Sequence, residues 1–204
     1  MILLLLDIDR TLVHSVPNYN VNSEWYNHFD SLKYENFTIF IRPHLTTFLD
    51  TLFKRQQQIK EEQQIKEEQQ IEDYSEKQNN NKYFQIGIFT AGSWHYMNYI
   101  TEKIFKDYPL NRNYLFHEYH SNQSLLFDNK LKSLDYIKSF LVLNKQEDNI
   151  YLIDDSVSVK NKIGENCYLI PKFYVCTDDI QPVFNKKALE DTSLLECLKW
   201  IDTI

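Results

Sequence analysis

The hydrophobic residues of this chain gather in short continuous segments that alternate with segments of helical spacing. Five apolar segments rich in strand-forming residues predict β-strands at residues 2–6, 83–89, 114–116, 150–153 and 167–170. They lack alternating polar positions, as strands covered on both faces do. Apolar residues three and four positions apart predict helices after Pro43 and over residues 94–105, 133–143 and 191–201. This order predicts an α/β fold with a doubly wound parallel sheet.

Two stretches interrupt the alternation. Residues 12–41 include a hairpin-like strand at 37–41 and predict a small β-flap inserted after the first strand. Residues 56–82 are a low-complexity insert built on a QQIKEE repeat, in which isoleucines recur every six residues. On a helix this spacing places successive isoleucines about 120° apart, so no apolar stripe forms. We interpret the insert as a solvated helix in a surface loop rather than a partner-binding coil.

Length and composition limit the class of protein. The chain has 204 residues, 43% of them hydrophobic, which is enough for one well-packed core, and we expect a single domain over residues 1–204. The apolar opening ends at residue 6, well short of the roughly 20 residues that cross a bilayer. No cationic stretch precedes it, as one would in a signal peptide. We therefore expect a soluble intracellular protein that does not contact membranes.

Charge and residue usage exclude further classes. The net charge of −7 disfavours nucleic acid as a partner, because an acidic surface repels the phosphate backbone. The three cysteines have no paired spacing, so we expect buried, reduced thiols rather than disulfides or a zinc site. With only three glycines, the chain has neither a dinucleotide-binding turn nor a glycine-rich phosphate loop. Any phosphate chemistry must use another arrangement.

Acidic residues follow two of the predicted strands directly. Asp7 and Asp9 come after the first strand, and Asp154 and Asp155 come after the strand at 150–153. Burying carboxylates at the centre of a sheet is costly unless something compensates their charge, and a divalent cation does so. The alternative for the first pair is that Asp9 caps a turn and Asp7 pairs with a lysine. The pair alone does not decide between the two interpretations.

Two other positions supply hydroxyl and cationic groups. Thr90 and Ala91 follow the strand at 83–89 and offer a hydroxyl and backbone N–H groups near a helix N-terminus, where anions bind. An ordinary N-cap at Thr90 or Ser93 is the alternative. Lys132 precedes a predicted helix and by itself reads as a solvated surface lysine. Because the carboxyl ends of adjacent parallel strands converge on one crevice, we expect these groups to meet the four aspartates.

Together these side chains predict phosphoryl transfer. Asp7 can attack phosphorus if a magnesium ion and Lys132 neutralise the incoming phosphate. Asp9 can protonate the departing oxygen and afterwards deprotonate the water that cleaves the aspartyl-phosphate. Mg²⁺ is therefore the predicted cofactor.

Residues 7–15, DIDRTLVHS, resemble the DxDxT opening of the haloacid dehalogenase-like phosphatases. Their LVHS continuation is similar to that of one branch, the small phosphatases of the RNA polymerase II C-terminal domain. Later blocks resemble the family in the same order, at Arg42-Pro43-His44, Phe89-Thr90-Ala91, Lys132, Ile153-Asp154-Asp155-Ser156 and Asp191. The similarity spans nearly the whole chain apart from the repeat insert.

This resemblance implies a role for each candidate residue. Asp7 would be the phosphorylated nucleophile and Asp9 the acid/base. The implied metal ligands are the carboxylates of Asp7 and Asp155 and the backbone carbonyl of Asp9, and Asp154 would orient the lysine. The implied substrate contacts come from Thr90, Ala91, Lys132 and Tyr96, with Thr90 and Lys132 on the transferring phosphoryl group.

The chain departs from the family pattern at three places. Arg10 stands where the branch usually has an acidic residue, and Asp155 where the small phosphatases often carry asparagine. The family's LFRE segment reads LFHE at residues 115–118, so an arginine that could grip a phosphopeptide is missing. His117 and His120 have a three-residue spacing that metal ligands can have, but we read them as two surface imidazoles.

The favoured function is a protein phosphoserine or phosphothreonine phosphatase, because a short β-flap leaves the crevice open to a peptide. The RNA polymerase II C-terminal domain is the substrate that the resemblance implies, and nuclear residence is implied in the same way. One alternative is a small-metabolite phosphatase of the same superfamily, which would usually carry a larger lid. Another is a catalytically silent phosphopeptide-binding protein, which would have lost one of Asp7, Asp9, Lys132 or Asp155.

Overall fold

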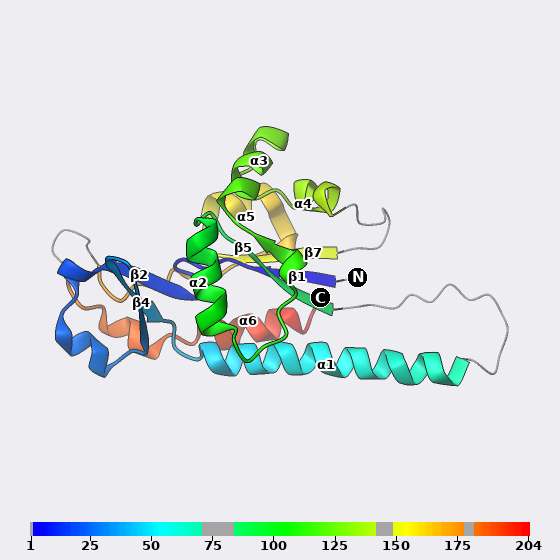
Figure 1. The fold of residues 1–204 in the computed structure, drawn as a ribbon, viewed down its shortest axis with the longest axis horizontal. Helices are drawn as coiled ribbons and strands as arrows, with labels where there is room; N and C mark the ends of the chain where they lie inside the picture. The colour runs from blue at the N-terminus through cyan, green and yellow to red at the C-terminus, as the bar shows by residue number, and fades with distance from the viewer. Residues whose placement is uncertain (1, 71–83, 142–148, 178–181) are drawn as a thin grey trace.

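A five-stranded parallel sheet lies at the centre of the computed structural model, which describes residues 2–70, 84–141, 149–177 and 182–204 (Figure 1). The strand order is β6-β5-β1-β7-β8. The strands are β1 (Ile2–Leu6), β5 (Phe84–Phe89), β6 (Leu115–Phe116), β7 (Asn149–Asp154) and β8 (Cys167–Leu169). The chain therefore leaves the central strand β1 and builds the sheet outward on both sides, which confirms the predicted doubly wound α/β fold.

Both faces of the sheet are covered by helices, which explains why its strands are continuously apolar. In β1, residues 3–6 are four leucines that are fully buried. Leu4 and Leu6 pack in one core cluster with α1 (Leu45–Gln70), α2 (Trp94–Ile104) and α6 (Ser193–Ile201). Leu3 and Leu5 pack in the opposite cluster with α4 (Leu134–Phe140) and α5 (Val157–Ile163). Burying each leucine contributes roughly 1.5–3 kcal/mol relative to leaving it exposed.

Serine side chains begin three of these helices at the same edge of the sheet. Ser93, Ser133 and Ser156 are the N-caps of α2, α4 and α5, and each hydroxyl accepts the backbone N–H three residues further on. The N-cap expected near Thr90 is thus provided by Ser93. Because β5 and β7 end just before α2 and α5, these helix N-termini border the carboxyl ends of the strands.

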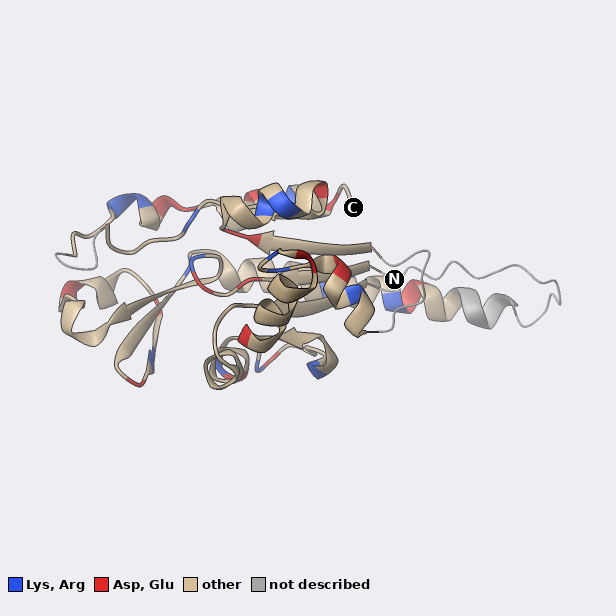
Figure 2. Ribbon diagram, turned by 90° about the horizontal axis from the view of Figure 1, so that it is seen from above, with Lys and Arg blue, Asp and Glu red and all other residues tan. Residues whose placement is uncertain are grey.

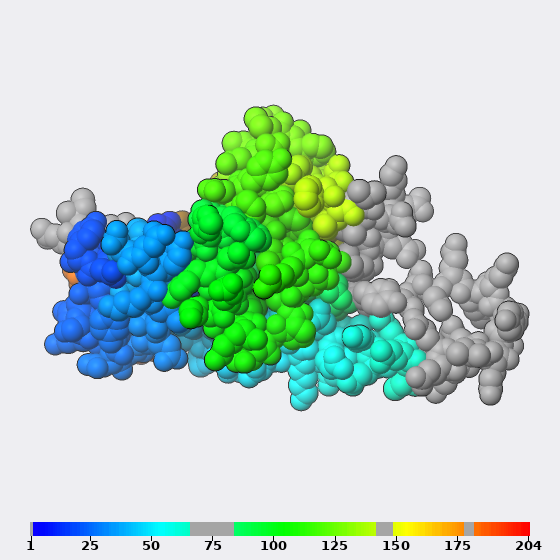
Figure 3. Space-filling model, in the orientation of Figure 1, coloured from blue at the N-terminus to red at the C-terminus, as the bar shows by residue number. Residues whose placement is uncertain are grey.

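The predicted flap is present as a three-stranded antiparallel sheet of order β2-β4-β3. Its strands are β2 (Val13–Pro17), β3 (Ser31–Tyr34) and β4 (Phe37–Ile41). Trp25, Phe29 and Phe40 of the flap form a core cluster with Phe173 and Val175 from the segment after β8. On the face shown in Figure 3 the flap lies against α2, where the Tyr34 ring packs 5.5 Å from that of Tyr96.

The repeat insert differs from its expectation in one respect. Its first part continues the helix α1 without a break to Gln70, rather than starting a separate helix within a loop. Gln56 anchors this continuation by donating to the Phe84 carbonyl at 3.1 Å. Ile59 is partly buried against the core while Ile65 is 53% exposed, as expected for isoleucines on different faces. Residues 71–82 of the insert lie outside the described residues.

The remaining elements are one α-helix and several short 3-10 helices. The helix α3 (Glu118–Asp128) and the short helix α5 were not predicted from the sequence. The 3-10 helices are η1 (Asn18–Asn20), η2 (Ser23–Asn27), η3 (Arg112–Tyr114), η4 (Gly164–Asn166) and η5 (Lys186–Glu190). The three cysteines are free and buried, as expected. In the described part of the chain, no helix combines the length and apolarity that crossing a membrane would need.

Candidate active site

A cavity of about 650 Å³ opens at the carboxyl ends of the strands, between the sheet and the flap. Seven of the eight residues singled out from the sequence line it, which are Asp7, Asp9, Thr90, Ala91, Lys132, Asp154 and Asp155. Tyr96 is the exception. The topology therefore gathers residues that are far apart in the sequence, as the convergence of parallel strand ends predicts.

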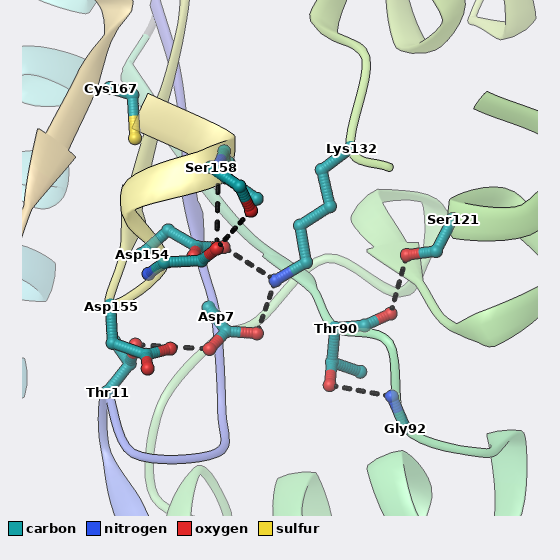
Figure 4. A network of polar contacts seen from close by, with 12 residues as sticks. Asp7, Thr11, Thr90, Gly92, Ser121, Lys132, Asp154, Asp155, Ser158 and Cys167 are labelled. Carbon is teal, nitrogen blue, oxygen red and sulfur yellow. Dashed lines mark hydrogen bonds and ion pairs between the residues drawn. The ribbon is translucent and has the colours of Figure 1, made fainter. Parts of the chain in front are cut away.

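Lys132 lies between two buried carboxylates (Figure 4). Its Nζ donates to Asp154 Oδ2 at 2.7 Å and to Asp7 Oδ1. The lysine side chain is only 4% exposed, which excludes the alternative of a solvated surface lysine. Burial lowers the pKa of Lys132, but Asp7 and Asp154 outweigh it and raise that pKa overall. The ammonium group thus stays charged at the floor of the cavity.

Asp7 is buried in the same network. Thr11 Oγ1 donates to its Oδ2 at 3.1 Å, while Lys132 occupies its other oxygen. Burial, opposed by Lys132 and reinforced by Asp154, raises the pKa of the Asp7 carboxyl. An additional positive charge at this place would keep Asp7 ionised at neutral pH, as a nucleophile requires.

Asp154 has both carboxylate oxygens occupied. Oδ2 accepts from Lys132, and Oδ1 accepts the backbone N–H of Ser156 at 2.8 Å. The carboxylate is thereby fixed by the first turn after β7 and holds the lysine against Asp7. This contact is the geometry that the resemblance implied for Asp154.

The described carboxylates include one cluster suited to a metal ion. Asp7, Asp154 and Asp155 each place an oxygen within 4.8 Å of the others. Asp7 and Asp155 are the two carboxylates of this cluster that the family resemblance implies as metal ligands, whereas Asp154 binds Lys132 and the Ser156 N–H. Burial, with Asp154 adding to it, raises the pKa of Asp155, so this carboxylate too lacks compensating charge. All-oxygen donors around a compact space fit Mg²⁺, which prefers hard oxygen ligands.

Asp9 points its carboxylate at different partners. Its Oδ1 accepts from the Tyr96 hydroxyl at 2.7 Å, and Ser15 Oγ lies 3.5 Å away. Burial raises the pKa of Asp9 although these two donors lower it. A carboxyl with a raised pKa holds a proton more readily, which suits an acid. The carboxylate of Asp9 is outside the metal-suited cluster, so a metal ligand from this residue stays a prediction about its backbone carbonyl.

Tyr96 contacts Asp9 rather than the cavity. Besides Asp9, its hydroxyl meets Ser15 Oγ at 2.9 Å. Burial, with Asp9 adding to it, raises the pKa of Tyr96, so the hydroxyl remains a proton donor to the carboxylate. Since Tyr96 is not among the lining residues, its implied contact with substrate stays a prediction, and its observed contact is with the acid/base candidate.

Thr90 presents its side chain at the cavity while its backbone is held from behind. Its Oγ1 accepts the Gly92 N–H at 3.0 Å, and its carbonyl accepts from Ser121 Oγ at 3.3 Å. The Thr90 hydroxyl hydrogen can therefore donate to a ligand. Ala91 lines the cavity beside it.

Sequence reasoning missed several residues of the site. Thr11 and Ser15 lie inside the DIDRTLVHS motif, and only their contacts with the aspartates show what they do. Lys172 lines the cavity with its Nζ 3.8 Å from Asp155, and it follows no recognisable motif. Arg10 was noted as a departure from the family, but its place in the cavity wall was not foreseen.

One interpretation of the histidines is wrong. His120 is 9% exposed and packs edge-on against the rings of Phe116 and Phe140, so it is not a surface imidazole. Its Nδ1 accepts the backbone N–H of His117 at 3.3 Å and so helps to cap α3. The spacing of three that suggested metal ligands is also the spacing of a helix capping box.

Residues 2–203 match the family model of NLI interacting factor-like phosphatases. The chain belongs to this family. It is thus a haloacid dehalogenase-like phosphatase, a class that hydrolyses phosphoric monoesters and is generally metal-dependent. This confirms the resemblance inferred from residues 7–15.

A curated relative and two solved structures are similar to this chain. A CTD phosphatase-like protein of Invertebrate iridescent virus 6 is 25% identical over 186 residues, covering 85% of this chain and 87% of the viral one. The fission yeast RNA polymerase II CTD phosphatase Fcp1 bound to beryllium fluoride matches 97% of this chain with a TM-score of 0.54 and 18% identity. A second Fcp1 structure matches 97% with a TM-score of 0.54 and 16% identity. The chain spans about half the length of these Fcp1 chains, 50% and 48%. At 18% and 16% identity, the likeness concerns the fold alone.

Proposed function

We propose that this phosphatase removes phosphate from phosphoserine and phosphothreonine in proteins, with Mg²⁺ as cofactor and Asp7 as the phosphorylated nucleophile. The observation that carries the proposal is the buried arrangement around Asp7. Lys132 and Thr11 fix its two oxygens, Asp155 lies beside it, and the cavity above it is open. A nucleophile held this way needs little reorganisation before attack.

The cofactor would be held by the carboxylates of Asp7 and Asp155 and by the backbone carbonyl of Asp9. When bound, Mg²⁺ supplies positive charge that offsets the repulsion between Asp7 and the incoming phosphate. Asp154 contributes indirectly, since its contact with Lys132 keeps the ammonium group aimed at the reacting centre. The Lys132 charge then stabilises the negative charge on the transferring phosphoryl oxygens.

The reaction proceeds in two displacements. An Asp7 oxygen forms a bond to phosphorus while the bond from phosphorus to the serine or threonine oxygen breaks, and the Asp9 carboxyl gives that oxygen its proton. Asp9, now ionised, takes a proton from water as the water oxygen attacks phosphorus. The bond between phosphorus and Asp7 then breaks and inorganic phosphate leaves. Thr90 and the Ala91 N–H orient the phosphoryl group by hydrogen bonds during both steps.

The shape of the cavity favours a peptide over a small metabolite. Among the described residues, the three-stranded flap is the inserted element that borders it, and exposed apolar side chains stand at its rim. Tyr19 is 86%, Phe37 41% and Leu131 37% exposed. Such a rim can contact residues on either side of a phosphoserine, whereas a metabolite would leave it unused. The RNA polymerase II C-terminal domain, named for the Fcp1 structures, is the first peptide substrate to test.

The test is hydrolysis of phosphoserine and phosphothreonine peptides by the purified chain, with and without Mg²⁺. We expect turnover with Mg²⁺, loss of turnover after chelation, and a fall in kcat of about 10³-fold or more in Asp7→Asn. Asp107→Asn is the matched control, because the Asp107 side chain is 78% exposed and is not among the residues that line the cavity.

Three results would overturn the proposal. Activity in Asp7→Asn equal to that of Asp107→Asn would remove Asp7 from the chemistry. If the kcat/KM for a phosphorylated metabolite exceeds that for every phosphopeptide tested, the chain is instead a metabolite phosphatase. A wild-type chain that binds phosphopeptides without turnover in Mg²⁺ would support the catalytically silent alternative.

A further inference from the structure

Two basic side chains of the cavity, Arg10 and Lys172, have no part in the chemistry proposed above. Both line the cavity that holds Asp7. Lys132, the other lysine there, is buried between carboxylates, whereas Arg10 is exposed and the Lys172 side chain is 43% exposed. The chain carries a net charge of −7, and its basic and acidic positions are interspersed over the ribbon (Figure 2). Two accessible cations beside the reacting centre therefore differ from the general surface.

The two cations lie on neighbouring backbone segments. The Arg10 carbonyl accepts the backbone N–H of Phe173, the residue after Lys172, at 2.8 Å. The Arg10 guanidinium lies over the ring of Tyr174, 5.0 Å from its centroid, in a cation–π contact. This contact limits the freedom of the Arg10 side chain without neutralising its charge.

Arg42 holds both segments from beneath. It is 1% exposed and donates to the carbonyls of Thr11 at 2.8 Å and Pro171 at 2.7 Å, one residue from Arg10 and one from Lys172. Its own charge is balanced by Asp191 at 2.8 Å. Because the backbone is fixed at both places, a ligand that meets the two cations has only their side chains to order.

The charges of Arg10 and Lys172 are incompletely compensated. Over the described ranges of the chain, no ion pair involves Arg10, and Lys172 has only the 3.8 Å contact with Asp155. A guanidinium and an ammonium group that line one cavity from neighbouring backbone segments suit an oxyanion, since the first can bind two oxygens and the second adds a point charge.

We propose that Arg10 and Lys172 form a second anion-binding subsite, which takes a negatively charged group of the substrate close to the phosphoserine or phosphothreonine under attack. The inference rests on the proposed protein phosphatase function and narrows its substrates to peptides with a phosphate or carboxylate beside the scissile phosphate. The transferring phosphoryl group itself belongs at Lys132 and Thr90, which are 4% and 1% exposed at the floor of the cavity. The exposed cations Arg10 and Lys172 can therefore bind a second negatively charged group of the same peptide.

A peptide series tests the subsite directly. Every peptide carries one phosphoserine, and a second position, moved stepwise on both sides of it, holds serine, phosphoserine or glutamate. At the matching position we expect the second anion to raise kcat/KM about fivefold, equal to about 1 kcal/mol. The advantage should shrink at high ionic strength, because salt screens exposed charges. Phosphoserine and glutamate arms show which anion the subsite prefers.

Variants of the two cations should reduce this preference. Arg10→Asn removes the charge and suits the left-handed backbone at this position, where φ is 62°. Lys172→Gln removes the other charge, and we expect the double variant to lose the preference for a second anion entirely. Lys199→Gln changes the net charge equally at an exposed position of α6, and we expect it to keep the preference.

Measuring peptide affinity shows whether a negative result concerns the anion-binding subsite or the proposed phosphatase function. Asp7→Asn should bind the matching doubly charged peptide about fivefold tighter than the singly charged one, without any turnover. Equal affinities at every position, or a preference retained in the double variant, would overturn the subsite. Preferential binding by a wild-type chain that never hydrolyses a phosphopeptide would uphold the subsite and overturn only the proposed phosphatase function.

Discussion

Arg42 organises the walls of the active-site cavity from a fully buried position. Its guanidinium spans four partners, which are the carbonyls of Arg10, Thr11 and Pro171 and the carboxylate of Asp191. Only a planar fork with several donors reaches all of them at once. The motif Arg42-Pro43-His44 was recognised from the sequence, but this function of the arginine depends on segments that the fold brings from either end of the chain.

Replacing Arg42 should cost much stability even where the charge is kept. We expect Arg42→Lys to lower the free energy of unfolding by about 2–3 kcal/mol, since an ammonium group leaves buried carbonyls unsatisfied. The measurement is chemical denaturation, with Arg55→Lys as control, because Arg55 pairs with Asp202 at the surface. Exposed pairs contribute about 1 kcal/mol at most. Equal losses in the two variants would contradict the structural role of Arg42.

The sequence was sufficient to predict those site residues whose chemical type is unusual for their position. Asp7, Asp9, Asp154 and Asp155 follow buried strands, where carboxylates are costly without a purpose. Thr11, Ser15 and Lys172 could not be found in this way, because a hydroxyl or lysine on a loop has many ordinary explanations. Their assignment required the contacts with the aspartates that only the folded chain provides.

At the scale of elements, the N-terminus of α3 depends on the protonation of one histidine. Burial, with His117 adding to it, lowers the pKa of His120 to about 4, below the value of about 6.5 for an unfolded chain. Between these values the unfolded chain binds a proton that the folded chain does not. The stability contributed by neutral His120 is therefore present above pH 6.5 and is lost as the pH falls toward 4.

His120→Gln should flatten this pH dependence. Glutamine can fill the same capping-box position without titrating. From pH 7 to pH 5 we expect the wild type to lose about 1–2 kcal/mol more stability than the variant, at most the linkage value for a pKa lowered from about 6.5 to about 4. Urea denaturation at both pH values measures the difference. The control variant His95→Gln, at an exposed position of α2, should show the same pH dependence as the wild type. If His120→Gln loses as much stability between pH 7 and pH 5 as the wild type, His120 is excluded as the cause.

The elements that were predicted correctly share a clear apolar pattern, and those that were missed lack it. Apart from the edge strand β8, where Leu169 is 37% exposed, the strands are largely buried, so their composition shows them directly. The helix α3 was missed because its apolar residues do not face the core. Leu126 is 79% and Phe127 56% exposed, while Ser121 and Ser124 are buried. The continuation of α1 into the repeat was not predicted, because the repeat composition does not indicate where the preceding helix ends.

At the scale of the whole molecule, the sheet and the flap together define which substrates can reach Asp7. The doubly wound topology puts β1 at the centre, so the motif that follows it lies where helix N-termini and strand ends meet. The flap packs on Phe173 and Val175, beside the Lys172 segment, and so completes the cavity without closing it. The fold class could be predicted from strand and helix alternation, whereas this joining of flap and late segment is a product of tertiary packing.

The central claim is that Asp7 carries the phosphoryl group, and trapping that species tests it most directly. In Asp9→Asn, an aryl phosphate with a good leaving group can still phosphorylate Asp7, because such a group departs without an acid, while removal of the phosphate by water slows about 10²-fold or more. After acid quench in the presence of Mg²⁺, peptide mass spectrometry should find phosphate on Asp7 of Asp9→Asn and none in the Asp7→Asn, Asp9→Asn double variant. Phosphate on another residue, or an active enzyme that never carries phosphate at Asp7, would contradict the account.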